Sequence, residues 1–328
     1  MTADLVDPYG RTVRDLRISI TDRCNFRCSY CMPAEGMDWL PRSELLTFEE
    51  IERIARVFVE RFGVDGIRLT GGEPTVRAHL PVLVGKLATL PIDLSMTTNG
   101  ATFRLLAEDL RSAGLGRVNI SLDSLRRERF LAITRRDELE RVLDGIAAAK
   151  EAGFDPVKVN VVLERGMNDD EIVDFATWGR EQGVAVRFIE FMPLDASGAW
   201  ARDAVVSQEE ILDAISTVYR LVPAPARGSA PADRWLYADG RGDVGIIPSV
   251  TKPFCGDCDR VRLTAEGQLR TCLFETREFD LRAIVRSGGT DDDLAAEIVR
   301  AVGTKWAGHA IGQVTFIRPT RSMSQIGG

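Results

Sequence analysis

"LRISITDRCNFRCSYCMP", residues 16–33, joins a short segment of alternating apolar and polar residues to three cysteines in a C-x3-C-x2-C spacing. The chain has six cysteines, which fall into two groups of three: Cys24, Cys28 and Cys31, and Cys255, Cys258 and Cys272. Cysteines grouped in this way are more typical of metal ligands or catalysis in a reducing compartment than of structural disulfides. We therefore expect two metal or catalytic sites, each with three cysteines.

The segment at residues 16–20 is the first of six short apolar segments, and the intervals between them have helical spacing. The other five are residues 66–72, 94–100, 117–123, 157–163 and 186–192. Two of the expected helices have capping-box sequences, Thr47 with Glu50 and Ser207 with Glu210. Strands that alternate with helices favour a parallel sheet. Six units are fewer than the eight of a closed (β/α)8 barrel, so an open partial barrel and a doubly wound sheet both fit.

Alternate positions in the first five segments are polar. These positions are Arg17, Ser19, Thr21, Arg68, Thr70, Ser95, Thr97, Asn99, Arg117, Asn119, Ser121, Asp123, Lys158 and Asn160. Parallel strands with helices on both faces are apolar throughout, so this pattern predicts a barrel whose lumen is lined by polar side chains. An antiparallel sheet with one wet face is the alternative, but the helical intervals count against it. In the sixth segment Arg187 and Met192 differ in parity, which indicates a bulge or a strand that ends before Met192.

The fold class we expect is α/β, a partial (β/α)6 TIM-like barrel with a smaller C-terminal domain. The stretch "LVPAPARGSAPADRW", residues 221–235, has the Pro, Ala and Gly content of a linker or long loop. We therefore place the barrel at residues 1–225 and the C-terminal domain, with the second cysteine group, at 226–328.

The bulk composition excludes some partners. A net charge of -7 argues against binding to a nucleic-acid backbone, which needs a basic surface. No apolar run approaches the length of a membrane span, and "MTADLVDPYGR", residues 1–11, does not resemble a secretory signal. We expect a cytoplasmic protein without a membrane or nucleic-acid partner.

The cysteine groups are better suited to iron than to zinc. Zinc usually takes four Cys or His ligands, and the only histidines, His79 and His309, are far from both groups in sequence. We assign both histidines to structure or surface, although a zinc site completed by a carboxylate or a distant histidine stays open. Cysteine thiolates are the usual ligands of iron–sulfur clusters, and a [4Fe-4S] cluster with three cysteines has one iron free to bind another ligand.

The cysteine motif, with an aromatic residue before its last cysteine, and "TGGEP" at residues 70–74 resemble the radical S-adenosylmethionine (SAM) superfamily. Within it, the chain is similar to the GTP 3′,8-cyclase family of molybdenum cofactor biosynthesis. The shared stretches extend over essentially the whole chain: "LRISITDRCNFRCSYCMP", "IRLTGGEPTVR", "TTNG", "VNISLDSL", "VKVNVVL", "FCGDCDRVRLTAEGQLRTCLF" and the terminal "GG".

The resemblance implies roles for particular residues. Cys24, Cys28 and Cys31 would hold a [4Fe-4S] cluster that binds SAM, and Cys255, Cys258 and Cys272 a second one that binds the guanine of GTP. The SAM contacts would be Tyr30, Gly72, Ser121 and Met192. The GTP contacts would be Arg17, Arg68, Thr97, Lys158, Arg260, Val261 and Arg262. The catalytic residues would be Arg17, Lys158, Gly327 and Gly328, with the glycine tail in the active site and Arg321 moving with it.

The resemblance also implies a reaction. SAM is cleaved reductively to a 5′-deoxyadenosyl radical, which abstracts the ribose 3′ hydrogen of GTP, and C3′ then attacks C8 of guanine to give (8S)-3′,8-cyclo-7,8-dihydroguanosine 5′-triphosphate. The implied partners are a reducing electron donor and the downstream cyclic pyranopterin monophosphate synthase, and a homodimer is compatible with the family. One departure is Asp259, where the family pattern has asparagine.

Three other interpretations stay open from the residues. The first is another radical SAM enzyme with an auxiliary cluster, such as one that modifies peptides. The second is a non-catalytic iron–sulfur electron carrier, and the third a zinc-stabilised binding module. A carrier would normally close its cluster with a fourth cysteine.

Overall fold

A computed structural model describes residues 3–195, 198, 200–311, 313, 316–319 and 321–327. Its strands form one sheet in the order β12-β11-β10-β1-β2-β3-β4-β5-β6-β9-β8-β7. The strands are β1 (Asp15–Ser19), β2 (Gly66–Thr70), β3 (Asp93–Thr98), β4 (Arg117–Ser121), β5 (Lys158–Leu163), β6 (Ala185–Glu190), β7 (Leu221–Pro223), β8 (Asp233–Tyr237), β9 (Asp243–Ile247), β10 (Arg260–Leu263), β11 (Gln268–Arg270) and β12 (Phe279–Asp280).

Strands β1 to β6 are parallel and follow one another in sequence order, which confirms the partial barrel. A doubly wound sheet would reverse its strand order at a switch point, and an antiparallel sheet would need reversed neighbours, so both alternatives are wrong. β6 ends at Glu190, before Met192, which explains the change of parity in the sixth segment.

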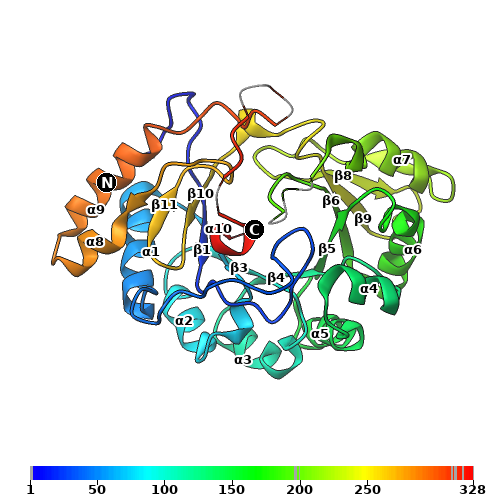
Figure 1. Ribbon diagram of the computed structural model, residues 1–328, viewed down its shortest axis with the longest axis horizontal. Coiled ribbons are helices and arrows are strands. Elements are labelled where there is room, and N and C mark those ends of the chain that lie inside the picture. Colours follow the sequence, from blue (N-terminus) through cyan, green and yellow to red (C-terminus); the bar gives the residue numbers. More distant parts are fainter. Residues whose placement is uncertain are drawn as a thin grey trace.

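Helices surround the sheet on its outer side, and the last helix, α10, lies near the centre of the barrel (Figure 1). The helices are α1 (Phe48–Phe62), α2 (Leu80–Leu87), α3 (Ala107–Ser112), α4 (Arg127–Thr134), α5 (Leu139–Glu151), α6 (Ile172–Gln182), α7 (Gln208–Ser216), α8 (Leu281–Arg286), α9 (Asp291–Val302) and α10 (Met323–Ile326). Short 3₁₀ turns are η1 (Pro74–Val76), η2 (Phe103–Leu105), η3 (Asp169–Glu171), η4 (Arg202–Ala204) and η5 (Cys255–Asp257).

Local sequence explains where two of these helices begin. Thr47 caps α1 and Ser207 caps α7, each in a reciprocal capping box with the glutamate three residues later, as predicted. Helix α1 ends at Gly63, whose φ of 65° lies in the left-handed region that glycine adopts without steric cost.

The main core lies between the sheet and this helical layer. It buries the apolar strand positions Ile18, Ile67, Leu69, Met96, Val118, Ile120, Val157 and Val159. The opposite face carries the predicted polar positions, because parallel pairing in register aligns residues of the same parity. One row across five strands reads Arg262, Arg17, Arg68, Ser95 and Arg117.

The C-terminal strands extend both ends of the barrel sheet. β10 pairs in parallel with β1, while β9 pairs in parallel with β6. Strands from both sides of residue 225 therefore belong to one sheet, and the division into domains at that residue stays a prediction. None of the described helices has the length and hydropathy that crossing a membrane requires.

Candidate active site

The first cysteine triplet lies on the loop that follows β1. Its backbone is bound to the end of α4, because the amides of Arg27 and Ser29 donate to the carbonyls of Thr134 and Ile133, at 3.0 and 2.9 Å. Phe26 points into the core and packs edge-on against Phe130. All six cysteines are free thiols, so none is used in a disulfide.

The double glycine after β2 allows two backbones to cross. The Gly72 amide donates to Thr21 O at 2.8 Å, and the next amide donates to Arg23 O at the same distance. A Cβ at Gly71 would lie 2.3 Å from Thr21 O, and one at Gly72 would lie 2.2 Å from Arg23 O. Only glycine fits at these two positions, so "TGGEP" is needed to hold the cysteine loop against the strand end.

Glu73 joins the ends of three strands. One carboxylate oxygen accepts from the hydroxyls of Thr75 and Thr98, both at 2.6 Å, and the other accepts from the Asn99 amide at 2.6 Å. The Asn99 side chain in turn donates to Asn25 Oδ1 on the cysteine loop at 2.7 Å. Burial raises the pKa of Glu73 despite these hydrogen bonds.

Tyr30 is oriented by a buried carboxylate. Its hydroxyl donates to Asp123 at 2.6 Å, and the other Asp123 oxygen accepts from the Val162 amide at 2.9 Å. Burial raises the pKa of Asp123 to about 6.

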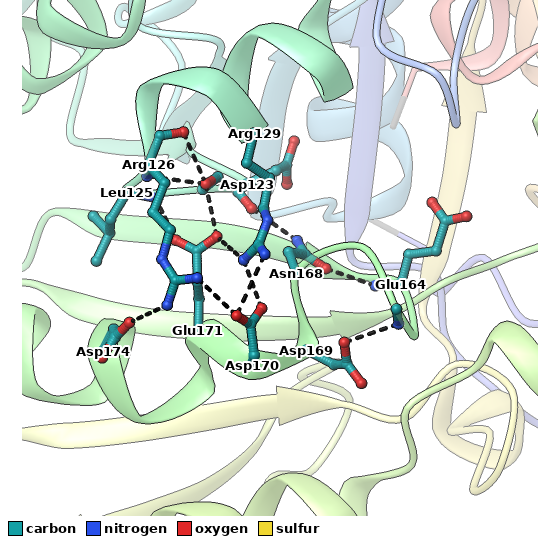
Figure 2. A network of polar contacts seen from close by, with 12 residues as sticks. Asp123, Leu125, Arg126, Arg129, Glu164, Asn168, Asp169, Asp170, Glu171 and Asp174 are labelled. Carbon is teal, nitrogen blue, oxygen red and sulfur yellow. Dashed lines mark hydrogen bonds and ion pairs between the residues drawn. The ribbon is translucent and has the colours of Figure 1, made fainter.

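The loop that carries Asp123 is itself held by a polar network (Figure 2). Asn168 donates from its side chain to the carbonyls of Asp123 and Val162. The fully buried Glu171 accepts from Ser124 Oγ at 2.7 Å and from Arg129 at 2.7 Å. The network therefore connects the carboxyl ends of β4 and β5, close to Ser121.

The thiols of the first triplet are in surroundings that disfavour their ionisation. Burial and the nearby Glu73 raise the pKa of Cys24 to about 12, and burial raises the pKa of Cys31 to about 11. Burial also raises the pKa of Cys28, and Asp123 adds to the effect. Arg27 lowers the pKa of Cys24 but does not offset burial, so thiolates here need a further positive centre, which fits ligation of iron.

The second triplet has different surroundings. Cys255 is the first residue of η5, Cys258 follows η5, and Cys272 follows β11. Burial raises the pKa of Cys272, whereas Arg260 and Lys305 outweigh burial and lower the pKa of Cys258. Three thiols that interact electrostatically with one another fit the chemistry of an iron–sulfur cluster.

Neither triplet converges on a single point. Among the described residues, no group of three His, Cys, Asp or Glu side chains has the geometry of a site for one metal ion. The three cysteines of a cubane bind three different irons, so they need not converge on a single ion as zinc ligands do.

The lumen contains several cations that have no carboxylate within ion-pair distance among the described residues. Burial, with Arg262 and Arg68 nearby, lowers the pKa of Arg17. Burial lowers the pKa of Arg262 to about 10, while burial and the Arg117 and Arg187 cations lower the pKa of Lys158 to about 8. Arg17 Nε and Ser19 Oγ are buried and have no hydrogen-bond partner among the described residues. This surplus of positive charge and unused donors fits a polyanionic ligand such as a triphosphate.

The C-terminal tail lies in the same lumen (Figure 1). Ser324, in α10, hydrogen-bonds to the thiol of Cys31, and Ile326 packs in a small core that Cys272 and Met192 border. Arg262 donates to the carbonyl of Gly327. A Cβ at Gly327 would lie 2.5 Å from Ser19 Oγ. The tail therefore touches both triplets, while Gly328 lies outside the described residues.

The remaining predicted positions differ in how they face the lumen. Thr97 is half-buried in register with Asn119 and Lys158. The Val261 side chain is fully buried in the core between the sheet and the helices, so only the Val261 backbone can bind a ligand in the lumen. Arg260 stacks on Phe254, 4.7 Å from the ring centre, and its Nε lies 3.5 Å from Asp259, the residue that departs from the family pattern. Arg321 anchors the tail through Glu266 and Glu278.

The two histidines do not join the site as ligands. His79 is exposed at the start of α2, and the His309 ring stacks on Phe274 at 5.0 Å between centroids.

Three residues of the site were not assigned from the sequence. Glu73 and Asn99 lie in the motifs "TGGEP" and "TTNG", and Asp123 continues the polar face of its strand. Their common signal is a polar side chain just beyond the carboxyl end of a parallel strand, where barrel enzymes build their sites.

Comparison with family models identifies the class of protein. The Radical SAM superfamily model matches residues 18–179, and the model for Molybdenum Cofactor Synthesis C matches residues 184–311. Two solved structures share the fold. Native anSMEcpe with bound AdoMet has a TM-score of 0.57 at 13% identity, over 87% of this chain and 79% of that one. SuiB of Streptococcus suis bound to S-adenosylmethionine has a TM-score of 0.57 at 12% identity, over 84% and 66%. The barrel and its first triplet thus define a radical SAM enzyme, with SAM and an iron–sulfur cluster as cofactors.

Curated relatives narrow the class. A GTP 3′,8-cyclase of Streptomyces coelicolor is 50% identical over 99% of this chain and 96% of its own length. GTP 3′,8-cyclase 2 of Mycobacterium tuberculosis is 49% identical over 100% and 93%, and the GTP 3′,8-cyclase of Rhodopirellula baltica is 51% identical over 99% and 92%. The chain belongs to the GTP 3′,8-cyclase family. It is therefore an enzyme, and the interpretations as an electron carrier or a zinc module are wrong.

Proposed function

We propose that this protein converts GTP to (8S)-3′,8-cyclo-7,8-dihydroguanosine 5′-triphosphate, the first step of molybdenum cofactor biosynthesis. The observation that carries the proposal is the lumen between the two triplets. Within the described part of the chain, it combines cations without a carboxylate partner, buried donors without a hydrogen-bond partner and a C-terminal tail that contacts both triplets.

The residues divide between two ligands. Cys24, Cys28 and Cys31 would hold the cluster that supplies, when bound, the electron for SAM cleavage. Tyr30, oriented by Asp123, and the Gly72 backbone border the same region, with Ser121 and Met192 as further SAM contacts. A reducing electron donor is required because the cleavage consumes an electron.

GTP would lie across the lumen. Arg17, Arg68, Lys158 and Arg262 would bind the triphosphate, with Thr97, Arg260 and the Val261 backbone completing the site. Cys255, Cys258 and Cys272 would hold a second [4Fe-4S] cluster on the guanine side. Arg17, Lys158 and the Gly327–Gly328 tail would keep the ribose in place while its 3′ hydrogen is removed. The product would pass to a cyclic pyranopterin monophosphate synthase. A homodimer and a cytoplasmic location stay predictions.

The test is an anaerobic assay of reconstituted protein with GTP, SAM and dithionite. Wild-type protein should carry about eight irons, and Cys24→Ala and Cys272→Ala about four each, because each variant loses one cluster. Cys24→Ala should form no 5′-deoxyadenosine. Cys272→Ala should form no cyclic product.

Two results would contradict the proposal. Normal cyclisation by Cys272→Ala would remove the second cluster from the reaction. Wild-type protein that cleaves SAM but leaves GTP unchanged would instead favour another radical SAM enzyme with an auxiliary cluster.

A further inference from the structure

A buried charge network lies against the backbone of the second cysteine triplet. It consists of Asp7 and Arg11, from the N-terminal segment, and Lys305, which follows α9. These side chains are almost fully buried, with 5%, 8% and 3% of their residues' surface exposed. Burial of three charges is costly unless each has partners, so their contacts call for an explanation.

Arg11 joins the backbone of Cys255 to that of residues 306–307. Its Nη1 donates to Cys255 O at 2.6 Å and to Ala307 O at 2.7 Å, and its Nη2 donates to Trp306 O at 2.5 Å. Its Nε donates to Asp7 at 2.6 Å. The planar guanidinium thus holds the ligand loop and residues 306–307 in a fixed relative position.

Lys305 binds the same loop further along. Its ammonium group donates to Cys258 O at 2.8 Å and to Arg260 O at 3.0 Å. Asp7 lies 4.0 Å from this ammonium group, and among the described residues it is the one carboxylate within ion-pair distance of either cation. Two cations and one carboxylate leave a net charge of +1 beside the triplet.

The segment after Lys305 packs directly against Cys255. A Cβ at Gly308 would lie 2.8 Å from Cys255 Cβ and 3.2 Å from its sulfur, and the His309 amide hydrogen-bonds to the Cys255 thiol. Beside the first triplet, the described charges that act most strongly on the thiols are instead the buried carboxylates Glu73 and Asp123. Positive charge and N–H donors stabilise the reduced form of an iron–sulfur cluster, which carries more negative charge.

We propose that Asp7, Arg11 and Lys305 are positioning residues for the second cluster, which hold the Cys255–Cys258 loop, and that their net positive charge raises the reduction potential of that cluster. This inference rests on the proposed function, since that function supplies the second cluster. The network binds backbone carbonyls of the ligand loop and of residues 306–307. It therefore acts through geometry and charge.

The test is an anaerobic redox titration of the reconstituted full chain, followed by electron paramagnetic resonance. The signal absent from Cys272→Ala identifies the second cluster. Lys305→Met should shift its midpoint potential to a more negative value, because a buried positive charge is lost. Asp7→Asn should shift it to a more positive value. Arg300→Met, on the exposed side of α9, should leave it unchanged.

Retention of iron gives a second readout. With a chelator present, Lys305→Met should lose the iron of the second cluster about 10-fold faster than wild type, as is typical when partners of metal ligands are removed. If Lys305→Met does not retain this cluster, Asp7→Asn still tests the proposal, because its midpoint potential should shift to a more positive value.

The outcomes separate the two proposals. If wild type shows no signal that Cys272→Ala lacks, the second cluster is absent, and the proposed function and this inference both fail. If the signal exists but Asp7→Asn leaves its potential unchanged or makes it more negative, only this inference is overturned. A purely structural network would weaken the cluster in both variants without shifts of opposite sign.

Discussion

The two cysteine triplets have the same number of ligands but opposite electrostatic surroundings. The first lies on one short loop, with Glu73 and Asp123 buried nearby, and the pKa of Cys24 rises to about 12. The second draws on two chain segments and has Arg11, Arg260, Arg262 and Lys305 nearby. These cations lower the pKa of Cys258, whereas burial still raises the pKa of Cys255 and of Cys272. The sulfonium of SAM is a cation and GTP is an anion, so each triplet has surroundings opposite in charge to the ligand proposed for it.

Removing a cation on the GTP side should have the largest effect on catalysis. Arg262→Met should lower kcat/KM for GTP by roughly 30-fold or more, since losing one partner of a buried charged contact costs about 2 kcal/mol or more. The KM for SAM should stay within about twofold. Steady-state kinetics with each substrate varied in turn measures both.

Arg104→Met is the control, because this arginine is ion-paired with Asp144 and Glu151 on the outer helical layer. It should change neither constant. An equal loss for SAM and GTP in Arg262→Met would mean that the two sides of the lumen are not electrostatically distinct.

The C-terminal tail contacts both triplets, and a substitution in it should have the next largest effect on cyclisation. Gly327 has a φ of 78°, and a Cβ there would lie 2.7 Å from Thr70 and closer still to Ser19. Gly327→Ala should therefore reduce cyclisation about tenfold, an effect of roughly 1.4 kcal/mol, while cleavage of SAM continues. The ratio of cyclic product to 5′-deoxyadenosine is the measurement.

Gly288→Ala separates clash from backbone strain. Gly288 has a similar φ of 80°, but nothing lies within 4 Å of its Cβ position. This variant should keep the wild-type product ratio, and a similar drop in both variants would remove the tail's special role.

Lys158 provides a pH test of the cationic side. Burial and neighbouring cations lower the pKa of Lys158 to about 8, so the free enzyme loses this charge above about pH 8, whereas an unfolded chain keeps it to about pH 10.4. The dissociation constant for GTP should rise up to about tenfold for each pH unit above 8. The same lowered pKa means that the destabilising effect of Lys158 on the fold is complete below pH 8 and disappears as the pH rises toward 10.4.

Equilibrium binding of GTP at pH 7, 8 and 9 checks the first of these effects. Lys158→Arg keeps its charge through this range and should bind GTP with little pH dependence. If wild type and this variant showed the same pH profile, a group other than Lys158 would control binding.

The smallest effect is expected on the SAM side. Tyr30→Phe removes one hydrogen bond to Asp123, and a hydrogen bond to a charged group contributes about 1.5–3 kcal/mol. Because its partner is Asp123 and not SAM, only part of this free energy is expected in SAM binding. The KM for SAM should rise several-fold and the KM for GTP should not change. If the KM for GTP rose more than the KM for SAM, Tyr30 would act on GTP binding and not on SAM binding.

Much of this architecture follows from local patterns in the chain. Period-two alternation predicted a polar lumen, and the register of the row from Arg262 to Arg117 confirms it, since parallel strands align equal parity. Spacing alone grouped the cysteines into two sets of three, and Thr47 and Ser207 marked two helix starts correctly. These features depend on neighbours in sequence, or on a repeat that every strand shares.

Other features depend on contacts between distant segments, which no local pattern records. β9 pairs with the edge of β6 and β10 with the edge of β1, so both extend the barrel sheet, although a linker-like stretch precedes them in sequence. Glu73, Asn99 and Asp123 became part of the site only when the strand ends met. Likewise, Asp7, Arg11 and Lys305 come together from both ends of the chain, because burial of a charge selects partners by distance in space and not by distance in sequence.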